Sequence, residues 1–237
     1  MDEKITMSLL PFNVESLYLV PLHLMPLLGT LIYILFPKNI NIHTTVLKNF
    51  IYVHNYGLHM FSGYIAYNLL GWFWKVGFNV NGNFYFTYSE IDTLVYYFYL
   101  SKYYEYFDTF ILYAKKRNPI FLQKFHHIGA VIVWHTMYYL RSDTLVFTTL
   151  FNSVVHTFMY VYYFLSSLKF KVNKYKIYVT LLQLAQLMSG LFIFIYNEGY
   201  LKEHILSSII LVFYVTSLVA LFLKFFAVNY IFGGKDE

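Results

Sequence analysis

The sequence predicts an all-α integral membrane protein, a bundle of seven transmembrane helices. Hydrophobic residues make up 59% of the 237 residues and charged residues only 12%, against roughly 25% charged residues in an average soluble domain. Apolar runs of about 20 residues, the length that crosses a bilayer, recur along the whole chain. Basic residues gather in alternate short loops between these runs, as they do in proteins that cross a membrane several times.

The seven expected spans follow one another without long linkers, internal repeats or low-complexity tracts. They cover approximately residues 15–36, 49–72, 91–114, 120–140, 144–167, 176–197 and 204–230. Pro37 follows the first span and Pro119 precedes the fourth, positions where helices stop or start. The turn-rich stretch from Asn79 to Asn83 separates the second span from the third. We therefore expect residues 1–237 to form one transmembrane domain.

The distribution of lysine and arginine predicts the orientation in the membrane. Nine of these residues lie in the first, third and fifth loops: Lys38, Lys48, Lys115, Lys116, Arg117, Lys169, Lys171, Lys174 and Lys176. Four lie on the opposite side: Lys4, Lys75, Arg141 and Lys202. Because basic loops favour the cytoplasm, we expect a luminal N-terminus and a cytosolic C-terminus, which an odd number of spans allows. The N-terminal segment lacks a basic leader, so no cleavable signal peptide is expected.

Composition also excludes several classes of function. The chain has no cysteine, which rules out disulfides, thiolate metal sites and any mechanism with a cysteine nucleophile. The net charge of +5 does not indicate nucleic-acid binding, because the lysines are confined to short loops where they serve membrane topology.

Charged residues inside the third span are the first candidates for function. Lys102, Glu105, Asp108 and Thr109 are spaced i, i+3, i+6 and i+7, so they share one helical face. A charged side chain at the centre of a membrane helix costs about 2.5 kcal/mol or more on insertion scales, and such residues are commonly functional. The alternative is a Lys–Glu–Asp network that only packs this helix against its neighbours.

Three further spans each carry one polar stripe. In the fourth span, Gln123, His126 and His127 fall at i, i+3 and i+4, so Gln123 can reach either histidine; His135, further along, is expected to be a bonded histidine of the bundle. The fifth span's stripe consists of Asn152, His156, Tyr160 and Tyr163. The sixth span's stripe consists of Thr180, Gln183 and Gln186.

Each stripe has a structural alternative: an interfacial histidine pair, tyrosine packing, or amides that join helices. Polar side chains within a membrane need partners or a water-filled cavity. Four neighbouring spans with one polar stripe each are most simply explained by a common cavity that all four face.

These residues resemble the motifs of the very-long-chain fatty acid elongases, the ELO family. The third span is similar to the family's Lys-x-x-Glu-x-x-Asp-Thr motif, and Gln123-Lys-Phe-His126-His127 is similar to its His-x-x-His-His box. The segment from Asn152 to Tyr163 resembles Asn-x-x-x-His-x-x-Met-Tyr-x-Tyr-Tyr, and Thr180 to Gln186 resembles Thr-x-x-Gln-x-x-Gln. The order and spacing of the motifs agree, over roughly residues 100–190.

The resemblance implies a seven-helix bundle that encloses an acyl-chain tunnel in the endoplasmic reticulum membrane. It implies the condensing step of fatty acid elongation, in which a long-chain acyl-CoA and malonyl-CoA give a 3-oxoacyl-CoA, carbon dioxide and CoA. Malonyl-CoA is then a co-substrate, and no bound cofactor is expected. The implied partners are the lipid bilayer and the ketoreductase, dehydratase and enoyl reductase of the cycle, but not nucleic acid; whether the chain forms a homodimer stays open.

Gln123 departs from the family pattern, because most members have histidine there; some microbial elongases of polyunsaturated chains resemble this sequence in having glutamine. A catalytic zinc site usually has three protein ligands, and the His126–His127 pair has no third histidine beside it in sequence. We therefore predict catalysis without a bound metal.

The chemistry of condensation agrees with the residues available. Without cysteine, a histidine is the remaining candidate nucleophile for the acyl group. We favour His126 or His156 as the acyl acceptor, with Asn152 and Asp108 orienting histidine rings. Direct attack within a ternary complex, in which the histidines act as acid–base groups, is the alternative mechanism.

The resemblance and the polar stripes together give the remaining site residues. Enolate stabilisation is expected from His127, Gln123 or Lys102. The substrate-binding residues are expected to be Lys102, Glu105, Thr109, Tyr160, Tyr163, Gln183 and Gln186, with Lys115, Lys116 and Arg117 near the CoA phosphates.

Two other classes of function are alternatives to this one. A membrane di-iron desaturase or hydroxylase needs about eight histidines in several boxes, whereas the nine histidines here are mostly single, with no His-x-x-x-His pair. A non-enzymatic seven-helix receptor or transporter would use the polar stripes to line a ligand path. A malonyl-CoA-dependent condensation assay separates all three.

Overall fold

The computed structural model describes residues 24–78, 84–196 and 205–233, and every regular element within these ranges is a helix. The chain divides into two compact units, one ending at Phe36 and the other beginning at Pro37. In the first unit, α1 covers Met25–Leu35, with Pro26 in its first turn and an extended Phe36 after its end. An extended residue before proline is expected, because the proline ring disfavours helical geometry there. Residues 15–23 of the first expected span lie outside the described ranges.

The second unit contains the helices that carry every predicted site residue. Their bounds are α2 Thr44–Val76, α3 Ser89–Tyr104, α4 Tyr106–Ala114, α5 Phe121–Tyr139, α6 Asp143–Ser167, α7 Lys176–Tyr196 and α9 Ile205–Phe226. A π-helical turn, Ala227–Ile231, continues α9. Helices α5 and α6 fall within one residue of the expected segments 120–140 and 144–167 at each end.

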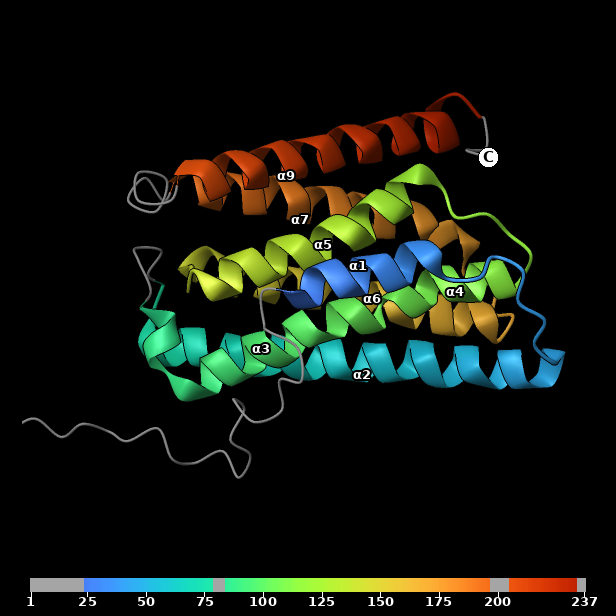
Figure 1. Cartoon of the computed structure of the whole chain (residues 1–237), viewed down its shortest axis with the longest axis horizontal. Coiled ribbons are helices and arrows are strands. Elements are labelled where there is room, and N and C mark those ends of the chain that lie inside the picture. Colours follow the sequence, from blue (N-terminus) through green and yellow to red (C-terminus); the bar gives the residue numbers. More distant parts are fainter. Residues whose placement is uncertain (1–23, 79–83, 197–204, 234–237) are drawn as a thin grey trace, which may run out of the picture. The chain divides into compact units, whose positions relative to one another are not determined.

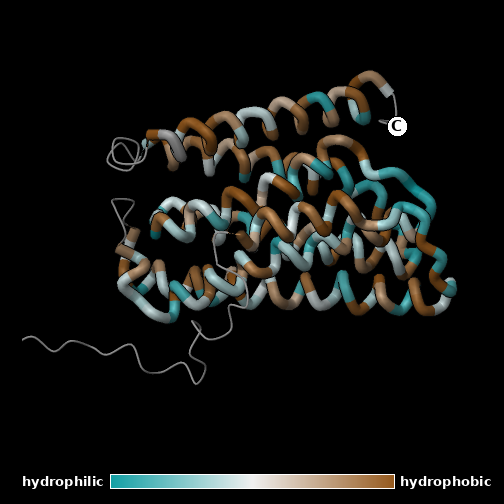
Figure 2. The backbone as a smooth tube through the Cα atoms, viewed as in Figure 1, coloured by the Kyte–Doolittle hydropathy of each residue, from teal (hydrophilic) through white to brown (hydrophobic). Residues whose placement is uncertain are grey.

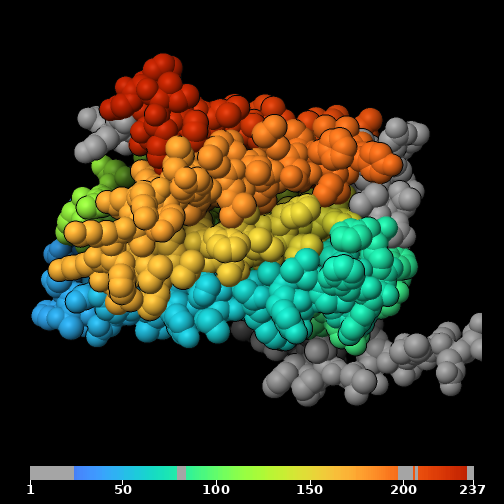
Figure 3. All heavy atoms as spheres, turned by 180° about the vertical axis from the view of Figure 1, so that it is seen from behind, coloured from blue at the N-terminus to red at the C-terminus, as the bar shows by residue number. Residues whose placement is uncertain are grey.

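These helices pack as a closed ring. The neighbouring pairs are α2 with α6, α6 with α7, α7 with α9, α9 with α5, α5 with α3, and α3 with α2. Neighbours run in opposite directions around this ring (Figure 1). On one face of the unit, α6 lies between α2 and α7 (Figure 3). A ring of antiparallel helices can enclose a cavity along its axis, as helical bundles often do.

The alternation of direction brings the basic loops to one end of this unit. The start of α2, the end of α4 and the start of α7 lie at the same end (Figure 1). Lys38, Lys48 and the basic residues within 115–117 and 169–176 therefore lie at this end, which we call the basic end, and the chain near 115–118 is its most hydrophilic part (Figure 2). Lys75 and Arg141 are at the opposite end.

Three helices end in the same way, with a basic residue in the left-handed conformation. Lys116, Arg141 and Lys169 have φ values of 58°, 54° and 67° at the ends of α4, α5 and α6. At α4, the Lys116 N–H bonds the Tyr113 carbonyl and the following N–H bonds the Leu112 carbonyl, which is the Schellman pattern. A basic side chain there also complements the negative end of the helix dipole.

The all-helical prediction is confirmed for the part of the chain that the structure describes, and within that part three helices are long and apolar enough to cross a membrane: Asp143–Ser167, Asn173–Tyr196 and Ser208–Ile231. Few of the residues in the apolar windows of the last two are buried within the protein, 17% and 11% respectively. Their exposed faces are apolar, as the brown colour of much of α9 shows (Figure 2), and a lipid environment accommodates such faces.

The third expected span, 91–114, is not one continuous helix. Helix α3 ends at Tyr104 and α4 begins at Tyr106, with Glu105 as the residue between them. The Asp108 N–H bonds the Glu105 carbonyl three residues back, a tighter turn than the α-helix. The interruption therefore falls on one of the predicted site residues.

Aromatic packing fills the end of the ring opposite the basic loops. Phe73, Tyr85 and Phe147 are each at most 3% exposed, and their ring centroids lie 4.9 to 5.5 Å apart, a spacing that favours aromatic pairs. The Asp143 carboxylate accepts the backbone N–H groups of Phe84 and Tyr85, at 2.7 and 2.9 Å. These bonds hold the short 3-10 helix Tyr85–Thr87 against the start of α6.

Candidate active site

A cavity of about 490 Å³ lies inside the ring and is lined by residues of α2, α4, α5, α6, α7 and α9. It brings together most of the predicted site residues: Glu105, Asp108, Lys115, Gln123, His126, His127, His156, Tyr160, Tyr163 and Gln183. The remaining predicted residues, Lys102, Thr109, Lys116, Arg117, Asn152 and Gln186, do not line this cavity. The polar stripes of four helices thus face a common space.

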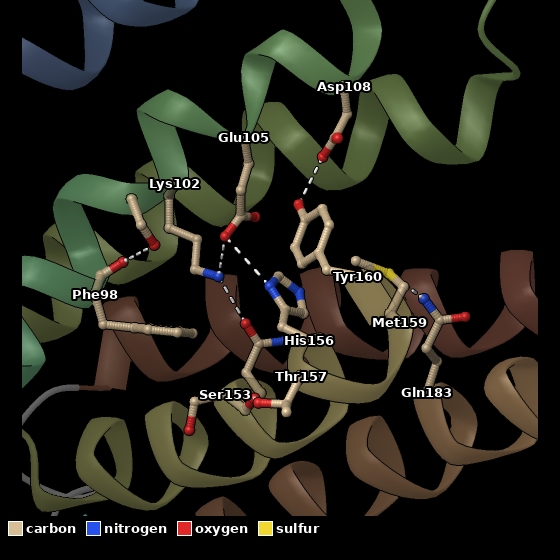
Figure 4. A network of polar contacts seen from close by, with 12 residues as sticks. Phe98, Lys102, Glu105, Asp108, Ser153, His156, Thr157, Met159, Tyr160 and Gln183 are labelled. Atoms are coloured by element: carbon tan, nitrogen blue, oxygen red, sulfur yellow. Dashed lines mark hydrogen bonds and ion pairs between the residues drawn. The ribbon is translucent and has the colours of Figure 1, made fainter. Parts of the chain in front are cut away.

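A buried ion pair stands beside the cavity. Lys102 Nζ donates to Glu105 Oε1 at 2.8 Å and to Asn152 Oδ1 at 2.7 Å, and both charged side chains are 2% exposed (Figure 4). The ammonium also lies 4.1 Å from the centre of the Phe98 ring and 4.9 Å from that of Trp134, within the range of cation–π attraction. The Lys102 charge is thus neutralised inside the protein and does not face the cavity.

Glu105 also approaches the histidine of the fifth span. His156 Nδ1 lies 3.4 Å from Glu105 Oε1 (Figure 4), longer than the usual N–H···O distance. His156 lines the cavity and is 5% exposed. A carboxylate beside Nδ1 favours the proton on that nitrogen and leaves Nε2 with its lone pair.

Asp108 bonds side chains of two other helices, one of them a histidine outside the sequence motifs. His54 of α2 lies with Nε2 2.8 Å from Asp108 Oδ1, and the Tyr160 hydroxyl donates to Oδ2 at 2.7 Å. The His54 side chain is fully buried. Asp108 therefore orients a histidine ring, that of His54, and it bonds neither of the two candidate acyl acceptors, His126 and His156. The side chain of Asn152 bonds Lys102 and Gln186 and no histidine.

Gln123 was expected to reach a histidine, and the structure gives it another partner. Its amide nitrogen lies 3.3 Å from the Thr109 hydroxyl of α4. The centroids of the His126 and His127 rings are 5.6 Å apart, and the His127 ring stands nearly perpendicular to that of Tyr106. The two adjacent histidines therefore have different surroundings.

The residues of the sixth-span stripe bond to α6 and to the C-terminal π-helical turn. Gln183 Nε2 contacts Met159 Sδ at 3.3 Å (Figure 4), and Gln186 accepts from Asn152 at 3.2 Å. Thr180 lies 3.2 Å from the hydroxyl of Tyr230 at the end of α9. These contacts join α7 to α6 and to the C-terminal turn, so the expectation that amides join helices also holds here.

His135, expected to be a bonded histidine of the bundle, has that role. Its Nδ1 lies 3.1 Å from the Tyr99 hydroxyl, and His135 does not line the cavity.

A second, smaller cavity of about 50 Å³ adjoins the first at His126. Its walls are mainly apolar and include Trp134, Met137, Leu145, Phe194 and Leu218. His126 is therefore common to the walls of both cavities.

The larger cavity also reaches the basic end of the ring. Lys115 and Lys176 line it, together with Ser166 and Ser167 at the end of α6. Burial, and secondarily the charge of Arg117, lower the pKa of Lys115. An anion bound there would favour the charged form of this lysine.

Lys116, which neighbours Lys115, has a different environment. Its ammonium bonds the Ile40 carbonyl at 2.9 Å and Asn41 Oδ1 at 2.8 Å, and so joins two loops of the basic end. The three adjacent basic residues thus differ in position. Lys115 lines the cavity, whereas Lys116 and Arg117 do not.

No three histidine, aspartate or glutamate side chains form a group able to hold a metal ion among residues 24–78, 84–196 and 205–233. Metal-free catalysis stays a prediction, because only a measurement on the protein tests it.

The arrangement places two candidate nucleophiles or bases, His126 and His156, on the wall of one cavity that also reaches Lys115 and Lys176. Such a site can hold a molecule with an anionic end and an apolar chain, with His126 at the point where the two parts meet. Hydrogen-bond donors at the cavity wall can stabilise a developing oxyanion or enolate.

Comparison with known proteins connects this site to a family. A "Very long chain fatty acid elongase 4" from Trypanosoma cruzi (strain CL Brener) is 34% identical over 164 residues, which cover 64% of this chain and 57% of that protein. A "Long chain fatty acid elongase 1" from Caenorhabditis elegans is 34% identical over 162 residues, covering 64% of this chain and 56% of that protein. "Fatty acid elongase sre1" from Dictyostelium discoideum is 42% identical over 105 residues, 43% of this chain and 38% of that protein. The chain thus spans little more than half the length of the first two relatives and less than half the length of the third.

The family model described as "ELO: GNS1/SUR4 family" matches residues 9–237. This match extends over nearly all of the chain and includes every polar stripe and both cavities. The chain belongs to the ELO (GNS1/SUR4) family of membrane-embedded proteins.

Proposed function

We propose that this protein is the condensing enzyme of fatty acid elongation, a 3-oxoacyl-CoA synthase. The observation that carries the proposal is the cavity of about 490 Å³ that brings Gln123, His126, His127 and His156 together, with a smaller apolar cavity that His126 also lines. The larger cavity has room for the thioester, its basic end suits the CoA phosphates, and the apolar walls beside His126 suit the start of the acyl chain. The names of the relatives, all elongases, support the same activity.

The reaction balances without a cofactor. Loss of carbon dioxide from malonyl-CoA leaves an enolate, which attacks the acyl carbonyl and forms a C–C bond. The thioester C–S bond breaks, and the CoA thiolate takes up one proton. The products are a 3-oxoacyl-CoA two carbons longer, carbon dioxide and free CoA.

The covalent form of this reaction uses a histidine as a temporary acyl carrier. Nε2 attacks the acyl carbonyl, the C–S bond breaks, and the proton lost from Nδ1 ends on the CoA sulfur. His126 suits the acceptor role because it lies where the apolar cavity begins. His156, with Glu105 beside Nδ1, suits either the acceptor role or that of the base.

Enolate stabilisation falls to donors that face the cavity. Gln123 and His127 line it, whereas Lys102 does not and is paired with Glu105 and Asn152. We therefore assign enolate stabilisation to Gln123 and His127 and assign Lys102 to holding Glu105 in place.

Lysines at the basic end are expected to bind the CoA phosphates. Replacing Lys115 and Lys176 with glutamine should raise the KM for acyl-CoA or malonyl-CoA about 5- to 30-fold, because each charged hydrogen bond contributes about 1 kcal/mol or more. The effect should be larger at low salt. Steady-state kinetics on correctly inserted protein measure it.

Lys116→Gln is the matched control, since Lys116 bonds the 40–41 loop instead of lining the cavity. It should lower thermal stability and leave both KM values unchanged. Unchanged KM values in the Lys115/Lys176 double variant would leave membrane topology as the role of these lysines.

Seven spans with a luminal N-terminus and a cytosolic C-terminus are part of the proposal. The collection of basic residues at one end of the ring supports this orientation, because basic ends favour the cytosol, where CoA substrates are made available. The endoplasmic reticulum location and the association with a ketoreductase, a dehydratase and an enoyl reductase rest on the resemblance to the elongases.

Activity without metal is the expected result for the purified protein. Treatment with a strong chelator, followed by dialysis, should leave the condensation rate unchanged, since His126 and His127 supply too few ligands for a typical catalytic zinc. Loss of activity on chelation together with recovery on adding zinc or iron would contradict this expectation.

A condensation assay tests the function itself. Purified protein in liposomes is supplied with malonyl-CoA and a panel of acyl-CoA primers, and the products are weighed. A 3-oxoacyl-CoA two carbons longer than the primer, formed only with malonyl-CoA, is the expected product. A desaturated or hydroxylated product, or no product with any primer, would overturn the assignment.

A further inference from the structure

Tyr214, on the last helix and outside every motif selected from the sequence, contacts the proposed acyl acceptor. Its hydroxyl donates to the His126 backbone carbonyl at 3.0 Å and lies 3.4 Å from Nδ1 of the same residue. The side chain is 8% exposed and lines the smaller cavity. One phenol therefore contacts both the main chain and the ring of a single histidine.

The position of the tyrosine ring depends on a glycine. A Cβ atom built on Gly129 would lie 2.6 Å from Tyr214 Cζ and 2.7 Å from Cδ2, distances that side chains do not tolerate. Phe125 packs on the ring with centroids 5.5 Å apart. The ring can therefore lie against α5 only because residue 129 has no side chain, and this close approach places the hydroxyl on His126.

The number of protons that these groups can donate then favours one tautomer of His126. A carbonyl oxygen can only accept, so the single hydroxyl proton of Tyr214 is used toward the His126 carbonyl. The phenol oxygen is left as an acceptor, and the facing Nδ1 has to carry a proton to bond it. The distance of 3.4 Å makes this a weak bond before substrate binds, and such bonds commonly tighten in the reacting complex.

We propose that Tyr214 is a positioning residue that keeps His126 in the Nδ1–H tautomer, so that Nε2 holds the lone pair that attacks the acyl group. This inference rests on the proposed function for its catalytic meaning, but the tautomer itself can be tested without it. Gly129 contributes to this positioning, because its lack of a side chain leaves room for the Tyr214 ring.

Reactivity of His126 toward diethylpyrocarbonate is the direct readout. The reagent transfers its ethoxycarbonyl group to an unprotonated imidazole nitrogen, and peptide mass spectrometry gives the rate for each histidine. Exposed His43 serves as the internal reference. Tyr214→Phe, which keeps the ring, and Gly129→Ala, which keeps the hydroxyl but displaces it, should each slow modification of His126 about fivefold, the effect of one ordinary hydrogen bond.

Two matched controls separate this effect from general loosening. Tyr138→Phe removes a tyrosine hydroxyl bonded to Asp92, and Gly71→Ala adds a methyl group where no atom lies within 4 Å. Both should leave His126 reactivity unchanged. Thermal unfolding of each variant identifies any that fold poorly, and Tyr214→Phe is the decisive variant because it preserves the packing.

The same variants are then incubated with a long-chain acyl-CoA alone, and CoA release is measured. A parallel fall in His126 reactivity and in CoA release supports both the positioning role and the acceptor role. A fall in His126 reactivity in protein that does not condense supports the tautomer and overturns the proposed function. A fall in His126 reactivity with unchanged CoA release supports the tautomer and overturns the assignment of His126 as the acceptor. Unchanged or faster modification of His126 in Tyr214→Phe overturns the inference.

Discussion

Condensation should fall at least about 10³-fold when His156 is replaced by alanine, the size of effect that follows loss of a nucleophile or a general base. His156 lines the larger cavity, and Glu105 lies 3.4 Å from its Nδ1, so no other side chain can take over both contacts. The initial rate of 3-oxoacyl-CoA formation measures the loss. The fold should persist, since the alanine variant leaves Glu105 paired with Lys102.

His59→Ala is the control for this experiment. His59 also lies within the ring, where its Nδ1 lies 2.9 Å from the Thr157 carbonyl, and it lines neither cavity. Its loss should cost about 1 kcal/mol of stability and leave the condensation rate close to that of the wild type. If His156→Ala keeps about a tenth or more of the wild-type rate, His156 is neither the acceptor nor an essential base.

The second large effect is expected on stability. Lys102→Met should destabilise the folded protein by about 3–5 kcal/mol, because it leaves the Glu105 carboxylate buried without its counter-charge. Asn152 also loses the donor that faces its side-chain oxygen at 2.7 Å. Unfolding in mixed micelles with increasing denaturing detergent measures the change.

The double variant Lys102→Met with Glu105→Gln tests whether the lost stability comes from the unpaired charge or from the changed shape of the side chain. It removes both charges, so most of the lost stability should return while condensation stays low, because His156 has lost the carboxylate beside it. Lys48→Met, at an exposed lysine over the Tyr52 ring, is the control. A single Lys102 variant within about 1 kcal/mol of the wild type would mean that the buried pair contributes little to folding.

Hydrophobic patterning predicted the helices well where proline, glycine or a lysine cluster marks their ends. The fourth and fifth segments agree with α5 and α6 within one residue, because apolar length and loop residues are local properties of the chain. The interruption at Glu105 could not be predicted this way. No proline or glycine lies near it, and the spacing of the charged residues fits an unbroken helix; the break forms where buried Glu105 meets Lys102 and His156 from different turns and helices.

The cavity itself was predictable, and its internal bonds were not. Polar stripes identify the faces that point inward, as the joint placement of Glu105, His126 and His156 around one space shows. The stripes do not identify which side chains form hydrogen bonds with one another. Asp108 bonds His54, a histidine of the second span that no motif identified, and Tyr214 resembles any other aromatic residue of an apolar helix. Such pairs are separated by 54 and 88 residues, so only the packing of the ring reveals them.

Weighing the protein after exposure to acyl-CoA alone tests the central claim, that a histidine of this cavity carries the acyl group. The purified protein is incubated with a long-chain acyl-CoA without malonyl-CoA, digested, and the peptides containing His126 and His156 are analysed by mass spectrometry. An acyl adduct on one of these peptides, with release of one CoA per protein and loss of the adduct when malonyl-CoA is added, is the predicted result. Absence of any adduct and of CoA release, in protein that condenses normally once malonyl-CoA is present, would contradict it and indicate direct attack within a ternary complex.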